Sequence, residues 1–426
     1  MMAPLRSLSL LALGALLTGA TPAPSEGESP RKTVADRIRD SASRARKGAL
    51  SEARREIASV LKVAPKAPGA LMVQACLQLE QGALDVAAQT VARLRAVAPE
   101  QAEGRVLEAL VRLRQANPSS EWRESFISAW INAGRPDLRV ERLLPEEAPE
   151  WGPEAIQAVW NGTQAPDTRL LAALMIGPSQ EQQRWIARHL AEVADPDLLR
   201  ATFETFHFDT LDETARRQIQ ASLRERLAPL AAESRDSQLP LLMLLEQTSQ
   251  DAPLTPKELQ ALERIAALPR YRTTSFARLY ADAERRMKVA GVEAPVDGAF
   301  MAAVGQLALL GPTILFKRVE ATTELPEKDR VRLGRALWTL GARIAEGNTM
   351  AERLIGLRQM EQAAGLLPDF DAKRAQVSAD LARGRAMVTA SNQVQMGGWP
   401  LPSLQRDWLK ASLDNEWKHL SALVAP

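Results

Sequence analysis

The sequence predicts an all-α protein, built as a right-handed α-solenoid of helical hairpins. Alanine, leucine and arginine dominate the 426 residues, whereas runs of strand-forming Val, Ile and Tyr are scarce. The stretch KGALSEARREIASVLKVAP (47–65) is nearly repeated by QGALDVAAQTVARLRAVAP (81–99), with eight of nineteen positions identical. Further along, apolar residues keep recurring at helical spacing between short turn-forming stretches. An array of hairpins lengthens without one central core, which suits a chain of this length.

The N-terminus has the layout of a cleavable secretory signal. Arg6 supplies a positive charge, Leu8–Leu17 forms an apolar stretch, and small residues follow. The apolar stretch is shorter than the ~20 residues that span a bilayer. We therefore expect a signal peptide over 1–23, a flexible linker over 24–32, and no integral membrane segment after cleavage. Cleavage after Ala20 and cleavage after Ala23 both fit the pattern.

Cysteine usage agrees with an exported, soluble protein. The chain has one cysteine, Cys76, which lies far from the cleavage site, so a lipid anchor is not expected. A single thiol forms no internal disulfide, and stability must come from packing. We expect a periplasmic or secreted location. The charge is nearly balanced, with 54 Lys+Arg against 52 Asp+Glu, which argues against a nucleic-acid partner.

The first elements along the chain repeat with a period of 34 residues. Gly48 and Gly82 stand at one position of this period, and Pro65 and Pro99 stand at another. Matching small and apolar residues lie at helical spacing between them: Ala53 and Ala87, Ile57 and Val91, Val60 and Leu94. This pattern resembles tetratricopeptide repeats, in which two helices per repeat are joined by a tight turn.

The resemblance covers two good repeats and a partial third, over residues 33–143. Arg44 and Gln78 stand where the family usually has tyrosine. The third repeat keeps Ala109 at the small position, but its second helix loses register through Asn117–Ser120.

The middle of the chain is expected to continue as helical hairpins. The stretch LLPEEAPEWGPEA (143–155) has linker composition, so we expect a Pro/Glu-rich linker over 144–166 and a helical solenoid domain over 167–392. ADPDLLRATF (194–203) is similar to the start of a HEAT-type repeat, and residues 335–369 resemble one more tetratricopeptide-like hairpin. Helices are expected over Gln180–Val193, Asp212–Leu230, Pro256–Leu268, Ser275–Ala290, Arg330–Ala345 and Ala351–Leu366.

The last segment, 393–426, is broken by Gly and Pro and then becomes amphipathic. We expect a capping helix that closes the exposed apolar end of the solenoid. The alternative is a docking helix for a partner.

No catalytic, cofactor or metal site is predicted. The three histidines include no i, i+4 pair, and no phosphate-binding glycine loop or Gly-x-Ser-x-Gly motif occurs. WRESFISAW (122–130) is a near-match to the Glu-Ser-x-Phe motif of periplasmic lytic transglycosylases, but it lacks the intervening residue. Glu124 is therefore expected to be a solvated helix charge.

Two surface features are candidates for binding. Residues 31–62 carry ten Lys+Arg and four Asp+Glu, which is either a solvated face or a patch that attracts anionic partners. In the tetratricopeptide family, ligands lie along the concave face built by the first helices. The resemblance carries this role to an inner strip that is either an open groove or a seam buried by downstream helices. Its partner-binding candidates are Arg46, Met72, Leu79, Val106, Leu110 and Leu113.

The predicted function is that of an exported scaffold or adaptor for protein partners in an envelope-associated assembly. Two alternatives remain open: a cell-wall-acting enzyme with a helical superhelix, and a structural subunit that associates with copies of itself.

Overall fold

The computed structural model describes residues 32–140, 142–144, 152–208, 213–246, 248–293, 296–307, 309–368 and 370–424. Most of these residues are helical. They contain no strand, and the pairing of Asp236 with Arg270 is an isolated bridge. The predicted all-α class is therefore confirmed. The predicted signal peptide and nearly all of the linker over 24–32 lie outside the described residues.

The chain forms two compact units. Unit 1 combines residues 1–148 with residues 385–426, and unit 2 contains residues 149–384. Unit 2 is thus inserted between two parts of unit 1. Helix α20 (Asp371–Val394) begins in unit 2 and ends in unit 1.

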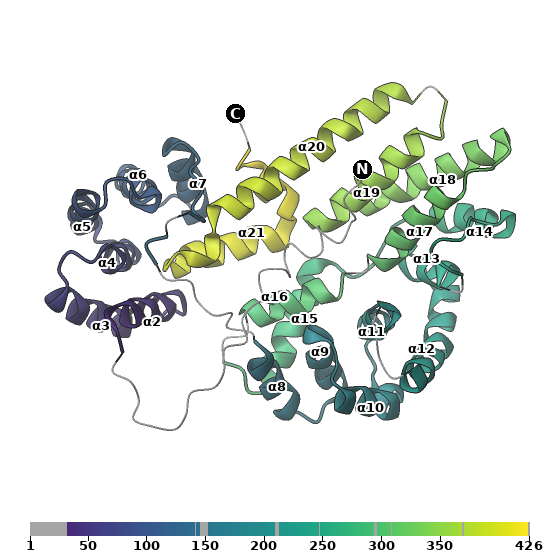
Figure 1. The fold of residues 1–426 in the computed structure, drawn as a ribbon, viewed down its shortest axis with the longest axis horizontal. Helices are drawn as coiled ribbons and strands as arrows, with labels where there is room; N and C mark the ends of the chain where they lie inside the picture. Colours follow the sequence, from purple (N-terminus) through teal and green to yellow (C-terminus); the bar gives the residue numbers. More distant parts are fainter. Residues whose placement is uncertain are drawn as a thin grey trace. The chain divides into compact units, whose positions relative to one another are not determined.

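Unit 1 begins with three consecutive helical hairpins (Figure 1). Each hairpin joins two helices that follow one another in the chain, and the pairs are α2 with α3, α4 with α5, and α6 with α7. The helices are α2 (Val34–Arg46), α3 (Leu50–Val63), α4 (Pro68–Glu80), α5 (Leu84–Val97), α6 (Ala102–Ala116) and α7 (Trp122–Asn132). The expected helical hairpins are confirmed. The third pair is complete despite the interruption at residues 117–120.

Equivalent residues of the first two hairpins adopt the same local structure. Gly48 and Gly82 have φ of +83° and +74°, the left-handed region that a residue without a Cβ enters most easily. Ala53 and Ala87 are both fully buried. The 34-residue period therefore corresponds to a repeated turn and a repeated buried small residue.

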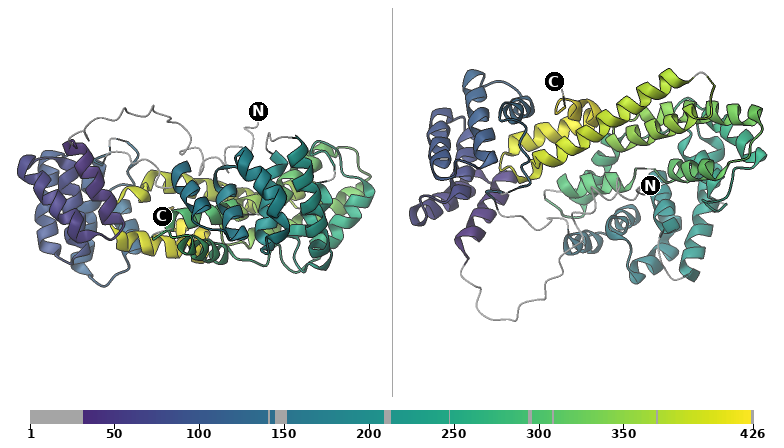
Figure 2. Two further views of the ribbon diagram at one scale, coloured as in Figure 1. Left: turned by 90° about the horizontal axis from the view of Figure 1, so that it is seen from below. Right: turned by 45° about the horizontal axis from the view of Figure 1, so that its top comes forward.

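The C-terminal part of unit 1 consists of the end of α20, the short 3-10 helix η2 (Met396–Gly398) and α21 (Pro402–Ser421). Asn415 has non-helical backbone angles and kinks α21. We expected this segment to cap the downstream solenoid. In the structure it belongs to the same unit as the N-terminal hairpins, and α21 lies against α7 (Figures 1 and 2).

Unit 2 is a set of helices that pair both with chain neighbours and with more distant partners. Sequential pairs include α8 with α9, α15 with α16, and α18 with α19, whereas α13 packs on α17 and α14 packs on α18. Its helices are α8 (Pro153–Asn161), α9 (Pro166–Ile176), α10 (Gln180–His189), η1 (Leu190–Glu192), α11 (Pro196–Phe208), α12 (Glu213–Glu233), α13 (Gln238–Leu245), α14 (Pro256–Ala266), α15 (Phe276–Val289), α16 (Val296–Gly305), α17 (Leu310–Ala321), α18 (Glu327–Ala345) and α19 (Met350–Ala364).

One helix of unit 2 lies inside the stretch that we expected to be a linker. Helix α8 starts at Pro153, directly after its N-cap Gly152. Proline is favoured at the first helical position because that residue's N–H has no partner within the helix. Ile156, Val159 and Trp160 are buried along one face. The Gly-Pro pair therefore starts a packed helix here.

One stretch of the described chain is long and apolar enough to cross a membrane by length and composition alone, namely Val296–Ala321. It comprises α16 and α17, and 53% of its most apolar window is buried inside the protein.

Candidate partner-binding groove

The inner strip predicted from the repeats is largely buried. Met72, Leu79, Val106 and Leu110 are each no more than 2% exposed. Leu113 and Arg46 are half-buried. Most of the strip is therefore buried in this structure.

Residues 396–424, here called the C-terminal segment, meet this strip. The Arg46 guanidinium donates a hydrogen bond to the carbonyl oxygen of Gly397 at 2.9 Å. Trp399 is 2% exposed, and its ring meets the edge of Phe126 with centroids 5.0 Å apart. Arg46 and Met72 are thus two predicted residues that the structure places against a segment of the chain itself.

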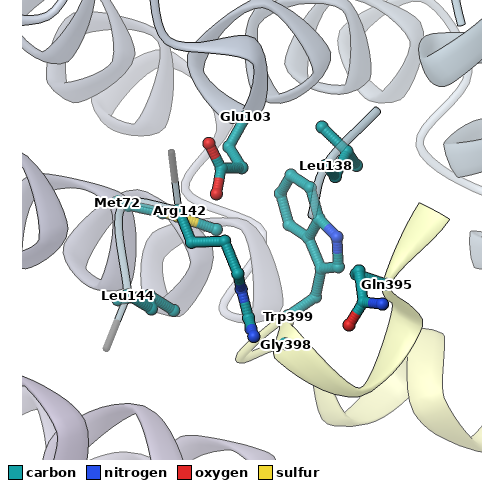
Figure 3. Close-up of a pocket in the computed structure, with 8 residues that line it drawn as sticks. All are labelled: Met72, Glu103, Leu138, Arg142, Leu144, Gln395, Gly398 and Trp399. Atoms are coloured by element: carbon teal, nitrogen blue, oxygen red, sulfur yellow. The ribbon is translucent and has the colours of Figure 1, made fainter. Parts of the chain in front are cut away.

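A cavity of about 10 Å³ remains where the segment and the hairpins meet, which is room for about one water molecule. Figure 3 shows that Trp399 and Leu138 lie on one side and that Met72, Arg142 and the carboxylate of Glu103 lie on the other. The fit between the segment and the hairpins is therefore close.

Two helix starts in unit 1 are capped across this contact by carboxylates. The carboxylate of Glu80, at the end of α4, accepts hydrogen bonds from Ser403 N at 2.9 Å and from Ser403 Oγ at 2.8 Å. The carboxylate of Asp407, in α21, accepts one from Trp122 N at 2.9 Å. The first N–H groups of a helix have no partner within the helix and carry partial positive charge. Each side thus supplies a carboxylate to a helix start on the other.

Arg114 is the arginine of this contact that lies near both capping carboxylates. Its guanidinium lies 4.4 Å from the centre of the Trp122 ring and donates a hydrogen bond to the Ser120 carbonyl oxygen. Burial lowers the pKa of Arg114, and the nearby charges of Glu80 and Asp407 oppose that shift. The half-buried guanidinium of Arg114 therefore lies close to both capping carboxylates.

His419 closes the contact at the other end of α21. It is 2% exposed, its Nδ1 lies 3.2 Å from Nη1 of Arg123, and its ring meets the edge of Trp408. Burial, followed by the charge of Arg123, lowers the pKa of His419 to about 4. The imidazole is therefore neutral at pH 7, and its Nδ1 accepts a hydrogen bond from the Arg123 guanidinium.

Glu103 is a buried carboxyl beside the cavity. Burial raises its pKa, although the Leu143 amide donates to Oε1 at 3.1 Å and Arg142 lies nearby. Its Oε2 is buried and has no hydrogen-bond partner among the described residues. This carboxyl holds the chain segment that follows the third hairpin against α6.

The groups of this unit that could carry chemistry do not converge. Glu124 has a side chain that is 65% exposed and lies 3.7 Å from the Arg123 guanidinium. Cys76 is fully buried, and burial followed by the charge of Glu80 raises the pKa of its thiol. Among the described residues, no group of three or more His, Cys, Asp or Glu could hold a metal ion.

The basic stretch over 31–62 is partly neutralised by its own acids. Lys32 pairs with Asp40, Arg39 with Asp36, and Arg37 with Glu56. Exposed basic residues remain along α3: Arg54, Arg55 and Lys62. The positive surface is therefore narrower than the sequence count indicates.

A larger cavity, of about 220 Å³, lies in unit 2. Its wall is mainly leucine, and two of its polar residues are engaged: Thr255 caps α14, and Asp329 pairs with Arg332. This cavity has the character of a gap between packed helices.

Sequence reasoning missed most of the polar residues at the contact between the C-terminal segment and the hairpins. Those residues are Glu80, Arg114, Ser403, Asp407 and His419. Only the Pro-Ser pair at 402–403, typical of a helix start, signals that N–H groups are presented there. The sequence does not show which carboxylate meets them.

Comparison of the chain with protein-family models, curated proteins and solved structures finds no match.

Proposed function

We propose that this protein is an exported scaffold or adaptor that binds protein partners in an envelope-associated assembly. On this proposal, unit 1 is a tetratricopeptide-like array and unit 2 an irregular continuation of a helical solenoid. The location is periplasmic or secreted. The observation that carries the proposal is the row of three consecutive hairpins, of which the first two share equivalent glycine turns and equivalent buried alanines; such an architecture chiefly serves protein recognition.

The accessible surface that fits an anionic partner is the outer face of α3. Arg54 and Arg55 are exposed, and no hydrogen bond or ion pair engages them among the described residues. Exposed like charges attract opposite charges at long range and lose that effect as salt rises. We therefore assign the first encounter with a partner to this face.

The test is crosslinking in cells followed by affinity capture from the envelope fraction. The protein is compared with the double variant Arg54→Glu, Arg55→Glu. The matched control is Arg374→Glu, Arg383→Glu on α20, where both arginines are also exposed. Substitutions inside the strip, such as Leu79→Glu, are unsuitable because they place a charge in a packed seam.

We expect a specific protein that is captured by the parent and by the control. Its yield should fall at least threefold in the Arg54/Arg55 variant at low salt. A yield that is equal in all three proteins would remove the α3 face from the proposal. Recovery of no protein with any of them would contradict the scaffold function.

A further inference from the structure

The C-terminal segment packs against a surface of unit 1 that includes Arg46, Met72, Glu80, Arg114 and Phe126, here called the groove. One aromatic ring, Trp399, is the buried anchor. The start of α21 donates to Glu80, and the Asp407 carboxylate meets the start of α7. An aromatic anchor with a few directed polar contacts is typical of recognition surfaces.

We propose that this groove is a binding site for a helix-starting segment of a protein partner, and that residues 396–424 occupy it as an internal competitor. The proposal rests on the proposed scaffold function, and it specifies the chemistry of the partner. The partner segment presents an aromatic residue ahead of its helix, free N–H groups at the helix start, and a carboxylate within the next two turns.

The charged groups of the groove determine where the partner segment needs donors and where it needs a carboxylate. Glu80 accepts hydrogen bonds, so it pairs with N–H donors and repels a carboxylate at the same point. Near the start of α7, the groove offers the Arg114 guanidinium and the N–H groups of a helix N-terminus, and both attract a carboxylate. A segment that brings donors first and an acid later matches both positions, as Ser403 and Asp407 do.

The structure also contains features that allow the segment to be exchanged. It joins α20 through Gln395, a residue other than glycine held at φ +47°, and Met396 and two glycines follow. Asn415 breaks the helical backbone within α21. Two buried polar atoms at the contact, Nε of Arg123 and Nε2 of His419, have no hydrogen-bond partner among the described residues. Each such atom weakens the contact relative to a fully satisfied one.

Tethering explains why the groove is filled in the isolated chain. A segment joined by a short linker is present at an effective concentration on the order of millimolar. A free partner segment of equal intrinsic affinity therefore binds only weakly until the internal segment is loosened or the partner segment makes additional contacts.

The experiment uses the full chain and a labelled peptide of residues 396–424 as the probe. Binding is measured by fluorescence anisotropy. Ser403→Ala with Asp407→Asn weakens the internal segment and leaves the groove intact, and Lys410→Ala, at an exposed position of α21, is the matched control. Glu80→Gln is then added to the loosened variant to weaken the groove itself. Hydrogen exchange of α4 and α21 reports whether the fold and the segment persist.

We expect the loosened variant to bind the peptide at least tenfold more tightly than the parent and the Lys410 control, because charge-assisted hydrogen bonds now favour the intact peptide. Adding Glu80→Gln should cancel most of that gain. Unchanged peptide affinity, or α21 amides as protected as before, would overturn the proposal. If light scattering showed a dimer that does not bind the peptide, the occupant of the groove would be a second copy of this chain. The proposal of a different protein as the partner would then be wrong. Because the assay uses no envelope protein, its failure is distinct from failure of the scaffold function.

Discussion

His419 links the stability of the C-terminal segment to pH. Its pKa is about 4 in the folded protein, against an ordinary value near 6.5 in an unfolded chain. The unfolded state therefore binds the proton more readily, and the stability contribution is full above pH 6.5. It is lost progressively as pH falls from about 6.5 to 4. The upper bound on the change is about 3 kcal/mol.

The measurement is hydrogen exchange of α21 amides between pH 4.5 and 7, corrected for intrinsic rates. We expect the free energy of opening to fall toward the acid end in the parent and to stay nearly level in His419→Gln. The control is His189→Gln, since His189 is more exposed and pairs with Glu192. An equal pH slope in the parent and the His419 variant would contradict the assignment.

Cys76 provides a second test at the residue scale. It is the only cysteine in the sequence, it is fully buried in α4, and burial raises the pKa of its thiol. Because the thiolate is the reactive form, a neutral buried thiol reacts slowly with alkylating reagents. We expect labelling at pH 7.5 to be at least a hundredfold slower than in denaturant, by mass spectrometry. Rapid labelling of the native protein would show that α4 is not packed as described.

At the scale of elements, the α18–α19 hairpin depends on two glycines that let its backbones touch. A Cβ placed on Gly356 would lie 2.5 Å from the Gly341 carbonyl oxygen, closer than packed atoms approach. Gly356→Ala should therefore push the helices apart and destabilise unit 2 by ~2–3 kcal/mol. Gly305→Ala, where nothing lies within 4 Å, should be neutral or slightly stabilising. Chemical denaturation checks both, and equal effects would contradict the close-contact explanation.

Helices were the part of the fold that the sequence predicted best. The hairpin at residues 335–369 and the equivalent turns at Gly48 and Gly82 are present, because periodic apolar residues and turn glycines act locally. Helix α8 was missed, because prolines and acids in a row resemble a linker whether or not Pro153 starts a helix. Local signals do not report which surface a helix will bury.

At the scale of the whole molecule, the sequence did not predict that the C-terminal residues form one unit with the N-terminal hairpins. Grouping of residues 385–426 with the N-terminal hairpins depends on contacts between residues some 300 positions apart, such as Glu80 with Ser403. The repeat pattern placed Arg46 and Met72 on the inner strip, and both lie next to residues of the C-terminal segment. The repeat pattern could not identify the segment that lies against these residues. A carboxylate and a helix start that meet only in the folded protein belong to no common sequence repeat.

The two-unit organisation predicts that a core substitution in unit 2 leaves unit 1 intact. Arg318 in α17 has a fully buried side chain, and its guanidinium donates to both carboxylate oxygens of Glu258 at 2.7 and 2.9 Å and to the carbonyl oxygens of Ala252 and Pro253. Burial raises the pKa of Glu258, but hydrogen bonds from Arg318 and Thr255 outweigh it and lower that pKa to about 2. Removing Arg318 leaves the half-buried Glu258 carboxylate without its cation and the carbonyl oxygens of Ala252 and Pro253 without their donor.

We therefore expect Arg318→Ala to lower the opening free energy of α14 and α17 by ~3–5 kcal/mol. The α4 amides should keep their protection, because none of the contacts within unit 1 is changed. Hydrogen exchange resolved by fragment mass spectrometry measures both units in one sample. Arg278→Ala, which removes an exposed arginine paired with Asp282, is the control and should cost under ~1 kcal/mol. If α4 lost protection by the same amount as α14, the inserted unit and its host would unfold as one cooperative body.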